Sequence, residues 1–87
     1  DDSVPEVRVG LATGQVLSRM GDVFGTTVNL ASRLTAMAKP GGTLVDPQTR
    51  AHLADDSRFV LRGQRGRPVR GFGVLRPYVL SRGVAAP

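Results

Sequence analysis

One stretch decides the fold of this chain, and it is GDVFGTTVNLASRL at residues 21–34. Gly21 and Gly25 bracket a tight loop, because glycine adopts positive φ without steric cost. A helix is expected to follow the loop directly, from about residue 26 to residue 38. Thr26 and Thr27 can cap this helix, since a hydroxyl accepts a hydrogen bond from a free N–H group of the first turn. The stretch therefore predicts a loop that leads straight into a helix.

The predicted helix has two distinct faces. Its apolar residues recur at three- and four-residue steps, which indicates a buried stripe made of Leu30, Ala31, Leu34, Met37 and Ala38. Asn29 and Arg33 are four residues apart, so they project from one face, one turn apart. Asp22 lies in the loop before them. An amide beside a guanidinium is suited to binding a polar ligand with phosphate oxygens.

Two flanking segments extend this pattern. The sequence VRVGLATGQV at residues 7–16 alternates like a strand and ends at a glycine turn, and AKPGGTLV at residues 38–45 stops the helix and starts another strand. Together with Gly-Asp-x-x-Gly-x-x-Val-Asn-x-Ala-x-Arg-Leu at residues 21–34, they resemble the catalytic domain of class III adenylate/guanylate cyclases, of the bacterial adenylate-cyclase type. The resemblance is strong over residues 7–53 and weaker over the remainder.

The resemblance implies a fold and an activity for the protein. Residues 1–87 would be the C-terminal part of the catalytic domain, the second half of a ferredoxin-like, cyclase-type α/β sandwich in which helices pack on a sheet. The full domain would convert ATP to 3′,5′-cyclic AMP and pyrophosphate by metal-assisted intramolecular phosphoryl transfer. It would work as a homodimer within a larger signalling protein, with upstream regulatory domains.

The same resemblance assigns roles to individual residues. Asn29 would orient the ribose, and Arg33 would stabilise charge on the transferring phosphate. Asp22 would accept a hydrogen bond from the exocyclic amine of adenine, and a carboxylate would repel the carbonyl that guanine has there. Val23, Phe24 and Gly25 are expected to line the substrate pocket through backbone and apolar contacts.

Arg70 completes the set of expected substrate contacts. The segment VRGFG at residues 69–73 resembles a late strand-turn segment in which the family has a triphosphate-binding Lys. An Arg departs from that pattern, although its guanidinium can still bind phosphate, and in bidentate fashion.

Each of these residues also has a purely structural interpretation. Asp22 can be a turn residue that holds its own backbone, and Asn29 can cap a neighbouring loop. Arg33 and Arg70 can be solvated cations, and Phe24 can be a core or interface anchor. Taken without the resemblance, each residue favours the structural interpretation. The resemblance, with all three residues at the matching spacing, favours the functional interpretation for Asp22, Asn29 and Arg33, whereas Arg70 stays open.

The expected cofactors are two Mg²⁺ or Mn²⁺ ions, but this chain offers no ligands for them. In the family two aspartates bind the metals, and they would lie upstream of the matched region or on the partner protomer. Asp1, Asp2 and Glu6 lack that motif context, and His52 stands alone, which indicates a surface or helix-end residue. The chain by itself is therefore expected to be inactive.

Charge is distributed unevenly along the chain. Residues 1–57 carry five Lys/Arg and seven Asp/Glu, whereas residues 58–87 carry seven Arg and no acid. Such a tail attracts polyanions. The chain has few aromatic residues and no nucleic-acid recognition motif, so no nucleic-acid partner is expected. There is no cysteine and no transmembrane-length apolar run, so a cytoplasmic domain is expected, with any membrane attachment through segments outside this chain.

The remaining elements follow from local patterns. Strands are expected near residues 7–12, 15–20, 43–45, 59–61 and 74–80, and a short helix over residues 47–53, capped by Asp46. Residues 63–73 are expected to form a loop or loose hairpin within an Arg-rich region (58–80), Pro77 lies at an edge or bulge, and residues 81–87 form a frayed tail. This order indicates an α+β fold. A non-catalytic cyclase-like module that binds nucleotide or dimerises is the alternative to an enzyme.

Overall fold

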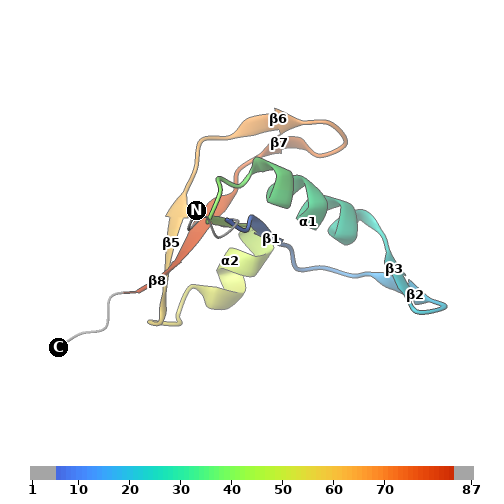
Figure 1. Cartoon of the computed structure of the whole chain (residues 1–87), viewed down its shortest axis with the longest axis horizontal. Helices are drawn as coiled ribbons and strands as arrows, with labels where there is room; N and C mark the ends of the chain where they lie inside the picture. Colours follow the sequence, from blue (N-terminus) through green and yellow to red (C-terminus); the bar gives the residue numbers. More distant parts are fainter. Residues whose placement is uncertain (1–5, 84–87) are drawn as a thin grey trace, which may run out of the picture.

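A four-stranded mixed sheet with strand order β1-β4-β8-β5 forms the centre of the molecule (Figure 1). The structure is a computed structural model that describes residues 6–83, without the side chains of Arg19 and Asp22. β1 (Val9–Leu11) runs parallel to β4 (Thr43–Val45), and β4 pairs antiparallel with β8 (Tyr78–Arg82). β8 also pairs antiparallel with β5 (Phe59–Gly63).

The helix α1 (Thr26–Met37) lies directly on β1 and β4. The predicted apolar stripe is confirmed, since Leu34 and Ala38 are buried together with Leu44 of β4, and Leu30 and Met37 pack against them. Gly10 allows the close approach. A Cβ atom there would lie 2.3 Å from the backbone nitrogen of Thr35 and 2.5 Å from the carbonyl oxygen of Ala31.

The expected capping of α1 by threonine is wrong. Gly25 is the N-cap, at φ 124°, and the helix has no side-chain cap. Thr27 instead donates its hydroxyl to the carbonyl oxygen of Gln15 at 2.8 Å, which ties the start of the helix to the segment that follows β1. Because Gly25 adopts a conformation that L side chains rarely take, the chain enters the helix without a hydroxyl at the cap position.

The loop expected at residues 21–25 is largely a hairpin. β2 (Leu17–Arg19) pairs antiparallel with β3 (Asp22–Phe24), so the strand expected at residues 15–20 is confirmed and Asp22 opens a strand that was not expected. Met20 and Gly21 both have positive φ, at 53° and 83°. Two such residues form the tight turn whose twist suits a β-hairpin. Figure 1 shows the hairpin projecting beyond the N-terminal end of α1.

The short helix α2 (Pro47–Leu53) begins as predicted. The carboxylate of Asp46 accepts a hydrogen bond from the backbone nitrogen of Thr49 at 2.9 Å, and Pro47 occupies the first turn. Thr13 and Thr49 share a hydrogen bond between their hydroxyls at 2.7 Å. Arg50 lies over the ring of Tyr78, 5.4 Å from its centroid, so α2 is tied to the sheet through β8.

The prediction of a single last strand over residues 74–80 is wrong. Its first part belongs to β7 (Gly73–Leu75), which pairs with β6 (Arg67–Val69) in a separate hairpin. Pro77 lies in the break before β8, where its carbonyl oxygen accepts a hydrogen bond from the backbone nitrogen of Gln64. β8 continues to Arg82, past the expected strand end, while residues 84–87 of the expected tail lie outside the described residues. The mixed sheet with two helices agrees with the expected α+β class.

Candidate functional site

A cavity of about 510 Å³ opens between α1 and the turn of the β6–β7 hairpin. Two groups of residues line it. Thr26, Asn29, Ser32 and Arg33 come from α1, and Arg70, Gly71 and Phe72 come from the turn. The site is therefore assembled from segments that lie far apart in the sequence.

The helix presents these residues because its other face is buried. Asn29 and Ser32 are three residues apart, and Asn29 and Arg33 four, so all three share the face that points away from Leu34. The backbone nitrogen of Asn29 donates to the carbonyl oxygen of Gly25 at 3.2 Å, which places Asn29 in the first hydrogen-bonded turn. Burial of the apolar stripe thus fixes the orientation of the polar one.

The hairpin carries Arg70 to the same place. Val69 and Leu75 pack with Leu34 and Ala38, which anchors β6 and β7 over α1, as Figure 1 shows. The turn between them is tight, because the backbone nitrogen of Phe72 donates to the carbonyl oxygen of Val69 at 2.9 Å and Gly71 has φ 89°. Arg70 at this turn therefore faces the cavity that α1 lines from the other side.

The lining is suited to an anion. It contains two guanidinium groups, one amide and two hydroxyls, and none of the lining residues is acidic. Asn29, Arg33 and Arg70 are exposed, and their side chains have no hydrogen-bond partner among the described side chains and backbone. Unpaired guanidinium donors bind phosphate oxygens through strong, charge-assisted hydrogen bonds.

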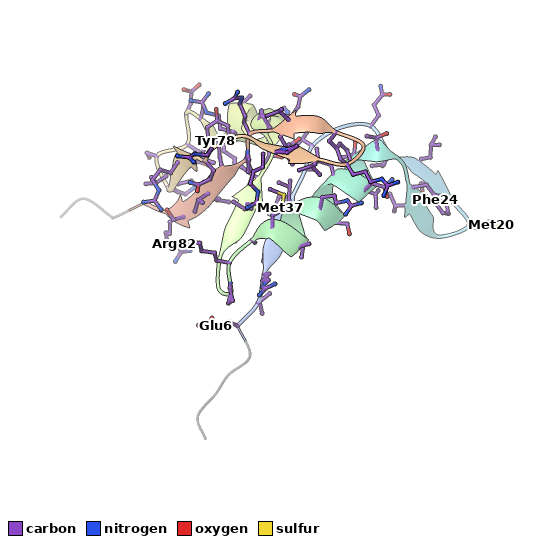
Figure 2. All side chains as sticks on the ribbon, turned by 90° about the horizontal axis from the view of Figure 1, so that it is seen from above. Glu6, Met20, Phe24, Met37, Tyr78 and Arg82 are labelled. Atoms are coloured by element: carbon purple, nitrogen blue, oxygen red, sulfur yellow. The ribbon has the colours of Figure 1, made fainter. Side chains whose placement is uncertain are left out.

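Some of the expected site residues line the cavity, and the others lie on β3 or directly after it. Asn29, Arg33 and Arg70 line one cavity. Val23 and Phe24 do not line it, because they lie on β3 with 50% and 49% of their surface exposed. Figure 2 places Phe24 on the hairpin, which has Met20 at its far end.

The other two expected residues lie at the ends of the elements. Gly25 is the N-cap of α1, next to the lining residue Thr26. Asp22 opens β3, and its side chain lies outside the described part of the structure.

Four lining residues were not expected from the sequence, and one of them, Gly71, directly follows the expected Arg70. Thr26 and Ser32 lie three residues before and after Asn29, so helical periodicity contained the signal for both. Phe72 had no such signal, because its position depends on how the β6–β7 hairpin folds back over α1.

The described residues do not fit a metal site. Among the side chains that the structure describes, no group of three or more His, Asp or Glu is close enough to hold a metal ion. His52, in the last turn of α2, is exposed. In the same part of the chain, no helix has the length and apolar character needed to span a membrane.

Comparison with known proteins identifies relatives over most of the chain. Residues 3–82 match the family described as the adenylate and guanylate cyclase catalytic domain. The chain is 48% identical over 86 residues to a protein named adenylate cyclase from Glutamicibacter nicotianae. It is 43% identical over 108 residues to one of the same name from Streptomyces coelicolor. These matches cover 99% and 94% of this chain but 21% and 28% of the relatives.

A solved structure supports the same relationship. The catalytic core of a rhodopsin-guanylyl cyclase with converted specificity, in complex with ATPαS, superposes with a TM-score of 0.77 at 28% identity. The match covers 86% of this chain and 42% of that one. The expected cyclase-type α+β fold is thereby confirmed, and this chain accounts for less than half of the matched catalytic core.

Proposed function

Because this chain belongs to the adenylate and guanylate cyclase catalytic domain family, we propose that it forms the C-terminal part of an adenylate cyclase catalytic domain. The complete domain converts ATP to 3′,5′-cyclic AMP and pyrophosphate. The ribose 3′ oxygen bonds to the α-phosphorus, the bond from that phosphorus to the pyrophosphate oxygen breaks, and the hydroxyl proton leaves to solvent or a base. A protein accelerates such a transfer mainly by positioning the reactants and stabilising negative charge.

The observation that carries this proposal is the shared cavity of Asn29, Arg33 and Arg70. Asn29 orients the ribose through its amide, and Arg33 stabilises the charge that develops on the transferring phosphate. Arg70 approaches from the opposite wall and holds the triphosphate, a role that its planar guanidinium can fill in place of a Lys. Asp22, Val23, Phe24 and Gly25 contribute the base pocket, with Asp22 selecting adenine.

The active site is completed by a second protomer. The family resemblance implies two Mg²⁺ or Mn²⁺ ions, and the described residues offer no ligand cluster for them. The ligands therefore come from another part of the protein. The β2–β3 hairpin supports association, since it exposes 71% of Leu17 and 97% of Met20. Apolar side chains gathered on a projecting element are typical of an interface.

Substitution of Arg33 tests the proposal in the complete protein. Arg33→Ala is expected to lower kcat by about 10²- to 10³-fold, as the loss of one charge-stabilising donor does, with a modest loss of ATP binding. Arg82→Ala is the matched control, because Arg82 is exposed at the end of β8 and does not line the cavity. Cyclic AMP formed from ATP, with ATP binding measured separately, provides both quantities.

The outcome separates an enzyme from a non-catalytic module. An enzyme produces cyclic AMP and loses that activity in Arg33→Ala. If the complete protein binds ATP without turnover, it is a nucleotide-binding module, and the assigned activity is wrong. If Arg33→Ala keeps the wild-type kcat, the role given to Arg33 is wrong.

A further inference from the structure

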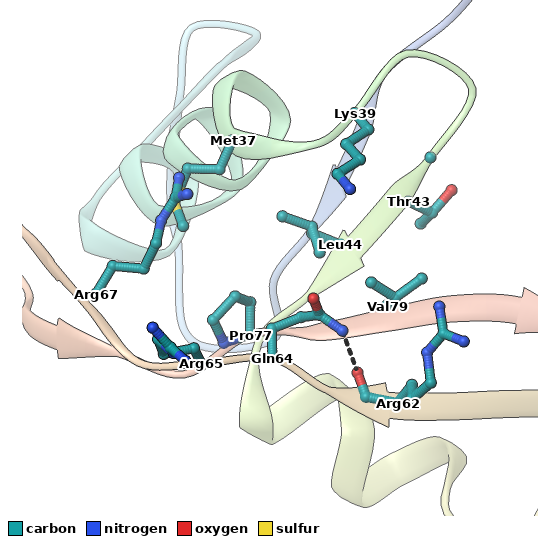
Figure 3. A pocket seen from close by; sticks show the side chains of 11 residues that line it. Met37, Lys39, Thr43, Leu44, Arg62, Gln64, Arg65, Arg67, Pro77 and Val79 are labelled. Atoms are coloured by element: carbon teal, nitrogen blue, oxygen red, sulfur yellow. Dashed lines mark hydrogen bonds between the residues drawn. The ribbon is translucent and has the colours of Figure 1, made fainter.

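A second cavity, of about 430 Å³, lies at the opposite end of α1 (Figure 3). Its charged lining consists of Lys39, which follows α1, together with Arg62 of β5, Arg65 of the loop after it and Arg67 of β6. No Asp or Glu is among the residues that line it. None of the proposed substrate contacts is part of this lining, so the cavity is separate from the candidate nucleotide site.

The floor of this cavity is apolar. Leu44 is 8% exposed, Pro77 is buried, and Val79 is half-buried beside them. Figure 3 shows Lys39 and Arg62 around this floor, and Arg67 and Met37 also line the cavity. The loop after β5 is held against the residue that precedes β8, because the backbone nitrogen of Gln64 donates to the carbonyl oxygen of Pro77 at 2.9 Å. The cavity thus combines a fixed apolar base with a cationic rim.

Four like charges around one cavity repel one another unless an anion neutralises them. Among the side chains that the structure describes, an ion pair joins Asp56 and Arg58, and the four cations of this cavity have no carboxylate partner. A volume near 430 Å³ falls in the range of small-molecule sites. No aromatic side chain lines the cavity, so it lacks the stacking platform that a nucleic-acid strand would use.

We propose that this cavity binds a small organic anion whose phosphate or carboxylate groups contact the cationic rim and whose apolar body rests on Leu44, Pro77 and Val79. The positive charge of the rim favours an anion, and the apolar floor favours an apolar group over water. This proposal concerns a site outside the nucleotide cavity and does not depend on the protein being a cyclase.

The position of the cavity gives the ligand a regulatory role. Arg67 of β6 lines this cavity, and Arg70, in the turn that follows the same strand, lines the nucleotide cavity. The helix α1 likewise contributes Met37 to one cavity and Arg33 to the other. An anion held between the rim residues restrains the β6–β7 hairpin and changes the affinity for ATP. This second part rests on the proposed function.

Calorimetric titration of the complete protein with 1-naphthyl phosphate tests the site. The Arg62→Gln/Arg65→Gln double variant is expected to bind this probe about tenfold or more weakly, because two charge-assisted contacts are lost. Two controls each remove the same number of charges. Arg8→Gln/Arg82→Gln changes residues outside both cavities, and Arg33→Gln/Arg70→Gln changes the nucleotide cavity. Both controls are expected to change the affinity less than about threefold.

Several results would contradict the proposed anion site. Equal weakening in all three double variants would mean diffuse electrostatic attraction, and weakening confined to Arg33→Gln/Arg70→Gln would place the probe in the nucleotide cavity. Failure of the wild-type protein to bind would mean that another part of the protein covers the cavity. Inorganic phosphate that binds as tightly as 1-naphthyl phosphate would exclude the apolar floor as a contact. Circular dichroism of each variant confirms that it is folded.

The regulatory part has its own measurement. The dissociation constant of ATP is expected to change by about threefold or more when 1-naphthyl phosphate is saturating, and to stay constant in Arg62→Gln/Arg65→Gln. An unchanged ATP affinity in the wild-type protein would remove the regulatory role and leave the anion site in place. If the complete wild-type protein binds 1-naphthyl phosphate but forms no cyclic AMP from ATP, the proposed function is contradicted and the anion site is not.

Discussion

At the scale of single residues, the proposed function attributes the preference for adenine over guanine to Asp22. Asp22→Asn, in the complete protein, replaces an acceptor by an amide that also donates, so it is expected to tolerate the guanine carbonyl. The ratio of kcat/KM for ATP to kcat/KM for GTP is expected to fall by about tenfold or more, since a site built for one hydrogen-bond pattern discriminates strongly. Steady-state kinetics with both nucleotides measure this ratio.

A carboxylate in another part of the chain provides the control for that substitution. Asp55→Asn also removes one charge, from an exposed residue in the loop that follows α2. It is expected to leave the ratio unchanged. Equal selectivity in the wild-type protein and Asp22→Asn would remove Asp22 from the base pocket.

Asp56 and Arg58 form an exposed ion pair with a defined dependence on pH. The Arg58 guanidinium and the Arg58 backbone nitrogen donate to the Asp56 carboxylate and lower its pKa from 3.8 to about 2. A lowered folded-state pKa stabilises the fold fully above the unfolded-state value, and the contribution is lost as the pH falls from about 4 to about 2. The contribution is small, because the pair is exposed and salt screens it.

Urea unfolding of the wild-type protein and of Asp56→Asn measures this contribution. The difference between their unfolding midpoints is expected to be constant from about pH 7 to about pH 5 and to shrink below about pH 4. High salt is expected to reduce it throughout. A difference that grows on acidification would contradict the assigned direction of the pKa shift.

At the scale of elements, the contact between α1 and β1 depends on Gly10. Gly10→Ala places a Cβ atom against the backbone of Thr35 and Ala31, neither of which is a flexible side-chain end. Overpacking of this kind is expected to lower the free energy of unfolding by about 1–3 kcal/mol. Gly63→Ala is the matched control on β5, where the new Cβ atom would meet the Tyr78 ring at an ordinary 3.5 Å.

Urea unfolding of the two glycine variants compares these contacts directly. Gly63→Ala is expected to stay close to the wild-type protein, because its backbone is extended and its new contact is unstrained. If Gly10→Ala were as stable as Gly63→Ala, the helix would not lie as close to β1 as the structure has it.

The sequence predicted α1 well, because an apolar stripe with helical spacing and a helix-breaking residue at each end define a helix. The apolar residues from Leu30 to Ala38 keep a helical period, and Gly25 and Pro40 end the pattern on either side. Asn29 and Arg33 could be placed on a common face for the same reason. Helical periodicity is a local property, so it needs no knowledge of the rest of the fold.

The sequence failed where long-range pairing decides the structure. Asp22–Phe24 is a strand only because Leu17–Arg19 lies beside it, and Gly21 and Gly25 favoured a loop at short range. Residues 74–80 are mostly apolar and favour one strand at short range, yet Leu75 joins the core beside Leu34 and Val79 pairs in the central sheet. That division at Pro77 accompanies the hairpin that brings Arg70 and Phe72 to the cavity beside α1, and no local pattern predicts it.

At the scale of the whole molecule, two cavities share one scaffold. The helix α1 and the β6–β7 hairpin contribute residues to both, and every charged lining residue is basic. The Arg-rich stretch after residue 57 therefore has a structural counterpart, since Arg62, Arg65, Arg67 and Arg70 all face a cavity. Much of the positive charge is gathered at sites suited to small anions rather than spread along a tail.

The β2–β3 hairpin provides the last prediction, because it is the most exposed apolar element of residues 6–83. Leu17 and Met20 are 71% and 97% exposed, and Val23 and Phe24 of β3 add to the same hairpin. Figure 2 shows Met20 and Phe24 on it. Leu17→Ser/Met20→Ser is expected to weaken dimerisation of the complete protein by about tenfold or more, since it removes apolar surface that a second protomer would bury. Sedimentation equilibrium measures the dissociation constant. Val60→Ser/Val74→Ser, which changes residues 48% and 61% exposed on β5 and β7, is expected to leave that constant unchanged. A dimer weakened equally by both double variants would mean that the hairpin is not the contact and that the composite active site must be assembled through another face.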